Sequence, residues 1–113
     1  MIDANQSLDI TALRDGYATG RFTPREIVEL VLDRIERQPD RKAWIALLPR
    51  ERLLAYAAAL SKLKPVDLPL YGIPFAIKDN IDVAGVATTA ACPAFAYTPQ
   101  QSADDMQRLI CAV

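Results

Sequence analysis

The chain reads Leu70-Tyr71-Gly72-Ile73-Pro74-Phe75-Ala76-Ile77-Lys78-Asp79-Asn80-Ile81 at the point where its sequence pattern changes from helical to extended. Residues 73–78 form a short apolar run that ends in a lysine and is followed by Asp79 and Asn80. Such a run predicts a strand buried on both faces, as strands are in sheets covered by helices. Ligands bind at the carboxyl ends of such strands. The candidate site of this α/β fold is therefore residues 78–80.

Lys78 is the residue of this stretch best suited to chemistry. An ammonium group surrounded by apolar residues is desolvated, which favours the neutral amine and lets it accept a proton. Alternatively, the lysine stem packs while its head reaches solvent or pairs with Asp79. Asp79 and Asn80 either shape the floor of a site or satisfy backbone groups where the strand ends, and Thr88 and Thr89 present the same choice.

The residues upstream of this stretch predict helices. One begins at Thr23, where Pro24 and Glu26 complete a capping box with proline at the first helical position. This helix should run to about Gln38 and stop at Pro39. Its apolar stripe contains Ile27, Val28, Val31, Leu32 and Ile35.

Two further helices flank this one. Ser7 is positioned to cap a helix that ends near Gly20, and a third helix opens at Pro49 and closes at Pro65. The stripes of all three helices are typical of core faces. We interpret residues 1–64 as an N-terminal helical segment.

Residues 65–113 show a different pattern. A turn or hairpin is predicted at residues 82–86 with Gly85 at its tight point, followed by a loop over residues 88–97. Ser102 and Asp105 have capping-box spacing before a last amphipathic helix. Helices followed by one or two strands and another helix are the opening of an α/β domain. We therefore expect one truncated domain, incomplete as a folding unit, whose sheet begins after residue 65.

Composition excludes several classes of function. Thirteen basic and fourteen acidic residues give a formal net charge of -1, which predicts neither nucleic acid nor a membrane as a partner. The chain has no histidine, which removes Ser-His-Asp and Cys-His catalysis and imidazole zinc sites. We expect no metal and no cofactor. Cys92 and Cys111 predict small buried thiols in a reducing, cytoplasmic setting rather than nucleophiles or a disulfide framework.

The stretch over residues 70–81, with Gly85 and Thr88-Thr89 after it, resembles the opening block of the amidase signature family. Residues 44–49 and 90–97 extend the similarity and are most like the amidase part of allophanate hydrolases. The resemblance implies a large α/β domain around a mostly parallel mixed sheet. It also implies cleavage of a small amide by a serine, a second serine beside a cis peptide, and a lysine, which matches Lys78.

The chain departs from the family pattern where the two serines belong. The family's Gly-Gly-Ser-Ser-Gly-type loop is not found in these 113 residues. The local serines Ser7, Ser61 and Ser102 are more simply explained as caps and a helix-face residue. We therefore expect an N-terminal fragment of an amidase-type hydrolase that is inactive alone.

Two alternatives remain at this point. The Lys78 block is shared with other amidases and with amidotransferase A subunits, so the fragment could derive from one of these. The other alternative is a non-enzymatic helical module that pairs through Ile27, Val31 and Ile35 with a complementing chain or a second copy of itself.

Overall fold

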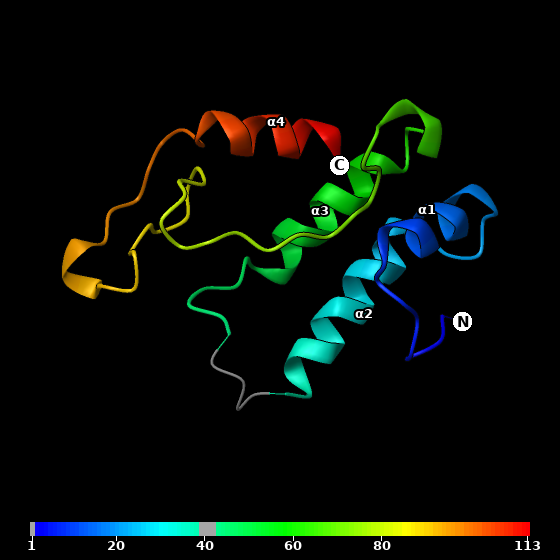
Figure 1. Cartoon of the computed structure of the whole chain (residues 1–113), viewed down its shortest axis with the longest axis horizontal. Helices are drawn as coiled ribbons and strands as arrows, with labels where there is room; N and C mark the ends of the chain where they lie inside the picture. Colours follow the sequence, from blue (N-terminus) through cyan, green and yellow to red (C-terminus); the bar gives the residue numbers. More distant parts are fainter. Residues whose placement is uncertain (1, 39–42) are drawn as a thin grey trace.

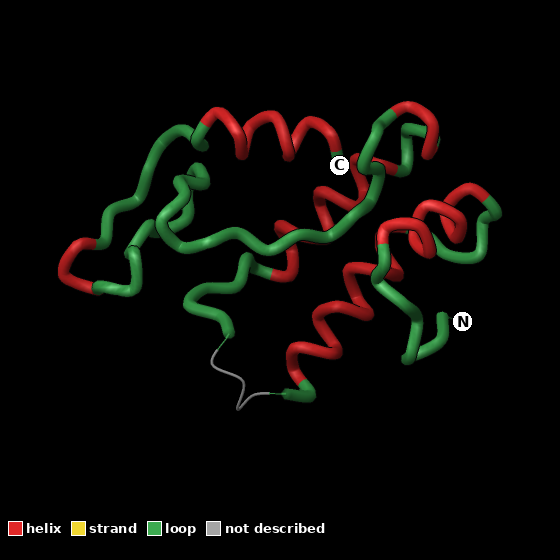
Figure 2. Tube along the Cα trace, in the orientation of Figure 1, coloured by secondary structure: helices red, strands yellow, loops and turns green. Residues whose placement is uncertain are grey.

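The computed structural model describes residues 2–38 and 43–113. Four helices make up its regular structure, and no strand is found among the described residues (Figures 1 and 2). The helices are α1 (Ile10–Ala18), α2 (Pro24–Glu36), α3 (Arg50–Leu60) and α4 (Asp104–Ala112), with short 3-10 turns η1 (Pro65–Asp67) and η2 (Pro93–Phe95) between them. No helix in this described part of the chain has the length and apolar character that a bilayer crossing requires.

Helix α2 begins as its sequence predicts. The Thr23 hydroxyl accepts a hydrogen bond from the Glu26 backbone N–H (3.3 Å), and the Glu26 carboxylate accepts one from the Thr23 N–H (2.8 Å). This reciprocal pairing satisfies two backbone donors that would otherwise lack partners at the helix start. The helix ends at Glu36, and the expected stop at Pro39 lies outside the described residues.

The expected caps of α1 and α4 are wrong. Helix α1 begins after Asp9 without a side-chain cap, and the Ser7 hydroxyl accepts a hydrogen bond from the Asp9 N–H instead (3.2 Å). Helix α4 begins after Ala103, also without a side-chain cap. The Ser102 hydroxyl accepts a hydrogen bond from the Ala84 N–H (3.0 Å), so it serves the turn at residues 82–86 and not the helix.

The core lies where α1, α2, the end of α3 and the segment after η1 meet. Its buried members are Leu13, Tyr17, Phe22, Ile27, Leu30, Leu60 and Tyr71. The Tyr17 ring meets the rings of Phe22 and Tyr71 edge to face, with centroids 5.2 and 5.4 Å apart. Helix α2 also packs against α3. Because Ile27 is fully buried in this core, the apolar stripe of α2 is partly covered by the chain itself.

The strand expected over residues 73–78 is absent. This segment leaves the core in an extended path toward the loop at residues 82–97, drawn in yellow to orange (Figure 1). A strand requires a neighbour that completes its hydrogen-bond ladder, and no described segment takes that place. Pairing is limited in the described residues to isolated bridges between Val83 and Val86 and between Thr88 and Tyr97. The first bridge confirms the turn around Gly85, whose φ is +76°.

Candidate functional site

The backbone that leads to Lys78 starts from a fixed point in the core. The Tyr17 hydroxyl donates a hydrogen bond to the Gly72 carbonyl (2.7 Å), and the Tyr71 hydroxyl donates one to the Leu60 carbonyl (3.2 Å). Gly72 has φ +65°, a conformation that favours glycine. The extended segment therefore begins at a turn held by helices α1 and α3.

The side chain of Lys78 is exposed, and so are those of Phe75 and Ala76 before it. This corrects the expectation of a strand buried on both faces around a desolvated lysine. The reason is the missing ladder, because no second strand or covering helix encloses this segment in the described residues. Lys78 also forms no ion pair with Asp79 among the described residues, where all ion pairs join arginine to a carboxylate.

Asp79 is held by the loop at residues 89–91. Its carboxylate accepts hydrogen bonds from the Thr89 hydroxyl and from the Ala91 N–H (3.3 Å), and its carbonyl accepts from the N–H groups of Thr89 and Ala90 (3.3 Å each). The Thr89 hydrogen bond lowers the pKa of the Asp79 carboxyl below its usual range, because it stabilises the charged form. Asn80, the other candidate for the site floor, is exposed.

The loop bound by Asp79 has an unusual backbone. Ala90 and Ala91 have φ of +49° and +60°, which a side chain with a Cβ rarely adopts. The loop then turns back, with the Cys92 N–H donating to the Thr89 carbonyl (2.8 Å). Cys92 is exposed here and Cys111 is exposed on α4, so the expectation of buried thiols is wrong for both.

Sequence reasoning missed a second carboxylate with hydroxyl partners, the Asp82 cluster, which consists of Asp82, Thr88 and Tyr97. Asp82 accepts hydrogen bonds from the hydroxyls of Thr88 (2.8 Å) and Tyr97 (2.5 Å), and Thr88 is buried. The hydrogen bond to Asp82 raises the pKa of Tyr97, because the phenol proton is shared with a carboxylate. In the sequence, the cluster is visible only as a few polar side chains spaced along a loop of small residues. The cluster closes the base of the loop that holds Asp79.

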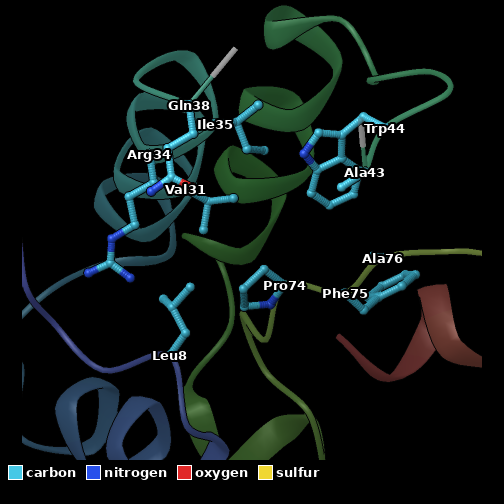
Figure 3. A pocket seen from close by; sticks show the side chains of 10 residues that line it. All are labelled: Leu8, Val31, Arg34, Ile35, Gln38, Ala43, Trp44, Pro74, Phe75 and Ala76. Carbon is cyan, nitrogen blue, oxygen red and sulfur yellow. The ribbon is translucent and has the colours of Figure 1, made fainter. Parts of the chain in front are cut away.

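An open groove of about 370 Å³ lies elsewhere on the molecule. Its lining comes from the N-terminal segment, α2 and the residue Gln38 beyond its end, the residues before α3 and the extended segment. The lining residues are Leu8, Val31, Arg34, Ile35, Gln38, Ala43, Trp44, Pro74, Phe75 and Ala76 (Figure 3). Lys78, Asp79 and Asn80 do not line it. In the described part of the chain, no group of three or more acidic or cysteine side chains is placed to hold a metal ion.

A family model described as amidase matches residues 26–112, which is most of the chain. This chain belongs to the amidase family. The match includes Lys78, the Asp79 loop and the Asp82 cluster, so the amidase resemblance of the Lys-Asp stretch is confirmed.

Three amidase relatives show which members of the family are similar. Urea amidolyase of Saccharomyces cerevisiae is 45% identical over 84 residues, which are 74% of this chain and 5% of that protein. The A subunit of the glutamyl-tRNA(Gln) amidotransferase of Chloroflexus aurantiacus is 37% identical over 109 residues, which are 93% of this chain and 22% of that protein. A solved allophanate hydrolase of Kluyveromyces lactis matches 99% of this chain and 18% of its own, with 33% identity and a TM-score of 0.75.

Proposed function

We propose that this chain supplies the lysine of an allophanate hydrolase-like amidase, with Lys78 as the proton acceptor for cleavage of an amide C–N bond. The observation that carries the proposal is the amidase family match over residues 26–112, which contains the Lys-Asp stretch. The allophanate hydrolase structure that aligns with nearly the whole chain supports this member of the family. A reducing, cytoplasmic setting belongs to the proposal, because Cys92 and Cys111 are both free.

The proposed reaction uses Lys78 in its neutral form. The lysine takes a proton, through a bridging serine, from a nucleophilic serine whose oxygen then bonds to the amide carbon. Backbone N–H groups stabilise the oxyanion, and the amide C–N bond breaks as the nitrogen receives a proton and leaves as ammonia. Water hydrolyses the acyl-enzyme. The 113 residues contain no Gly-Ser-Ser sequence, so both serines must come from other residues.

The extended segment at residues 73–78 is proposed to become a strand of a mixed sheet when those other residues are present. Among the described residues, the backbone N–H groups of Phe75, Ala76 and Ile77 have no hydrogen-bond partner. Free N–H groups along an extended, apolar segment are the surface to which another strand adds. Pairing there would cover the segment and reduce the exposure of Lys78.

The experiment that tests the proposal is a chimera in which this chain replaces the matching segment of the K. lactis allophanate hydrolase. We expect the chimera to release ammonia from allophanate, and Lys78→Ala to reduce that rate by about 10³-fold or more, as loss of one member of a catalytic unit does. Lys62→Ala, at an exposed lysine, is the matched control and should leave the rate unchanged. The isolated 113-residue chain should release no ammonia. Equal activity of the Lys78→Ala and parent chimeras would refute the proposal.

The second candidate is an amidotransferase A subunit, favoured by the 37% identity over 93% of the chain. The two candidates differ in the amide that is cleaved. A chimera with this chain in the matching segment of the C. aurantiacus amidotransferase, assayed for ammonia release from glutamine, tests the second. Activity in that enzyme, with none in the allophanate hydrolase chimera, would favour it. The third alternative, a helical interaction module, loses support because the fully buried Ile27 lies on the face it requires.

A further inference from the structure

Four hydrogen bonds converge on Asp79, the residue directly after Lys78. Its carbonyl accepts from the N–H groups of Thr89 and Ala90 at 3.3 Å each, and its carboxylate accepts from the Thr89 hydroxyl and the Ala91 N–H. The Lys78 carbonyl is also engaged, by the Ile81 N–H at 3.0 Å. The backbone on the carboxyl side of Lys78 is therefore held both by the local turn to Ile81 and by the loop at residues 89–91.

The loop at residues 89–91 needs these hydrogen bonds to hold its backbone conformation. Two successive alanines at positive φ each store strain on the order of 1 kcal/mol, which persists only where surrounding contacts hold the backbone. Asp79 offers the loop two acceptors, its charged carboxylate and its backbone carbonyl. Hydrogen bonds to a charged acceptor are the stronger of the two kinds. Without the carboxylate, the Ala91 N–H would keep only the Thr89 hydroxyl, at 3.2 Å.

The geometry points to Asp79 as a positioning residue of the amidase reaction. Its carboxylate clamps residues 89–91 against the backbone beside Lys78 and so fixes the direction in which the lysine side chain leaves the chain. The inference rests on the proposed function of Lys78. It assigns Asp79 no contact with substrate, and it makes the Thr89 hydroxyl the partner through which the clamp acts.

The first test measures the clamp without turnover. Hydrogen exchange of the loop around residues 89–91 is followed by mass spectrometry in the chimera that carries the full chain. Thr89→Val keeps the shape of the side chain but removes the hydroxyl, and it should speed exchange at Ala91 about tenfold, as does Asp79→Ala. Thr98→Val, at an exposed threonine of the same loop region, is the control. Thr89→Val leaves the direct hydrogen bond from the Ala91 N–H to the Asp79 carboxylate (3.3 Å), whereas Asp79→Ala removes it. Unchanged exchange in both variants would overturn the clamp whatever the enzyme does.

The second test measures the consequence for Lys78. Thr89→Val should lower kcat for ammonia release about 10- to 100-fold with KM within about twofold, because small displacements of a catalytic group cost rate more than binding. Thr89→Ser, which retains the hydroxyl, should restore the rate. Loss of folded enzyme alone scales the rate equally at every pH, whereas a displaced lysine moves the limb of the pH–rate curve that reports it.

The outcomes separate the two proposals. If Lys78→Ala leaves the rate of the chimera unchanged, the proposed function fails. If Lys78→Ala abolishes the rate while Thr89→Val changes neither kcat nor the shape of the pH–rate curve, the positioning role of Asp79 fails and the function of Lys78 stands.

Discussion

At the residue scale, the fixed start of the Lys78 segment depends on the fit between Gly72 and Tyr17. A Cβ built on Gly72 would lie 2.8 Å from the Tyr17 ring, and the backbone there has φ +65°. Gly20 has nearly the same backbone, with φ +72°, but open space around it. The two glycines therefore separate the cost of the backbone conformation from the cost of the contact.

We predict that Gly72→Ala destabilises the chain more than Gly20→Ala does. Both substitutions place a Cβ in the left-handed region, at a cost of about 1 kcal/mol. Gly72→Ala additionally pushes the buried Tyr17 ring, which overpacking data put at about 1–3 kcal/mol more. Urea unfolding of the two variants measures the difference. Equal midpoints would show that the Tyr17 ring moves without cost.

Tyr17 predicts how the stability of the chain depends on alkaline pH. Burial raises the pKa of the Tyr17 phenol well above its usual value, and the nearby Tyr71 adds a smaller increase. Burial also raises the pKa of Tyr71. The folded chain thus holds these protons more tightly than the unfolded chain, which releases them from about pH 10 upward. Stability contributed by the neutral phenols is complete below that pH and falls as pH rises.

Tyr17→Phe should accordingly reduce the loss of stability above about pH 10. At neutral pH it should cost about 1–2 kcal/mol, because the Gly72 carbonyl loses its 2.7 Å donor. Tyr56→Phe, which removes a hydroxyl from an exposed ring, is the matched control. Thermal melts from pH 7 to 11 measure both effects. An alkaline loss as steep in Tyr17→Phe as in the parent chain would contradict the role given to burial.

The contacts of Asp79 could be anticipated only in outline. Its position after Lys78 suggested a polar end to a strand, and its hydrogen-bonding role is what short acidic residues commonly do at such ends. Its partners lie ten and twelve residues away in a loop without periodicity, so no spacing rule pairs them. The exposure of Lys78 could not be anticipated either, because burial depends on neighbours distant in sequence.

At the element scale, α2 shows what local sequence can specify. Its cap joins residues only three apart, so the signal is complete within one turn. Ser7 and Ser102 also carry a hydroxyl shortly before a helix, as Thr23 does. Their hydroxyls nevertheless accept hydrogen bonds from other backbone groups, the Asp9 N–H and the Ala84 N–H. The strand at residues 73–78 fails for a related reason, because a ladder needs a partner that no local pattern supplies. The type and place of the helices and the cap of α2 were therefore predictable, whereas the starts of α1 and α4 were not.

This difference gives a prediction on two caps. Thr23→Ala should destabilise the chain by about 1 kcal/mol, because the Glu26 N–H loses its acceptor at the start of α2. Ser7→Ala, at the cap expected for α1, should change stability by less than about 0.5 kcal/mol, since within residues 2–38 and 43–113 its hydroxyl accepts a hydrogen bond only from the exposed Asp9 N–H. Chemical unfolding followed by circular dichroism measures both. A larger loss for Ser7→Ala would restore it as the functional cap.

At the scale of the whole molecule, the chain exposes more surface than a compact protein of its mass. Its accessible surface is 8001 Å², whereas a folded monomer of 12.5 kDa exposes about 6200 Å². Its radius of gyration is 15.0 Å, against about 13 Å for a compact domain of this length. The excess includes large apolar side chains, among them Trp44, Phe75 and Phe95. A surface of this kind favours association.

We predict that the isolated chain is weakly stable and associates with itself. Folding removes too little apolar surface from water to offset the conformational entropy lost by 113 residues. The free energy of unfolding should therefore lie below about 5 kcal/mol. Light scattering should give a mass that rises with concentration, and the thermal melt by circular dichroism should be broad. Within the chimera the same residues should exchange their amide hydrogens more slowly, because other parts of the enzyme cover them. A monomer at all concentrations with a sharp, cooperative melt would mean that this exposed surface is compatible with an independent fold.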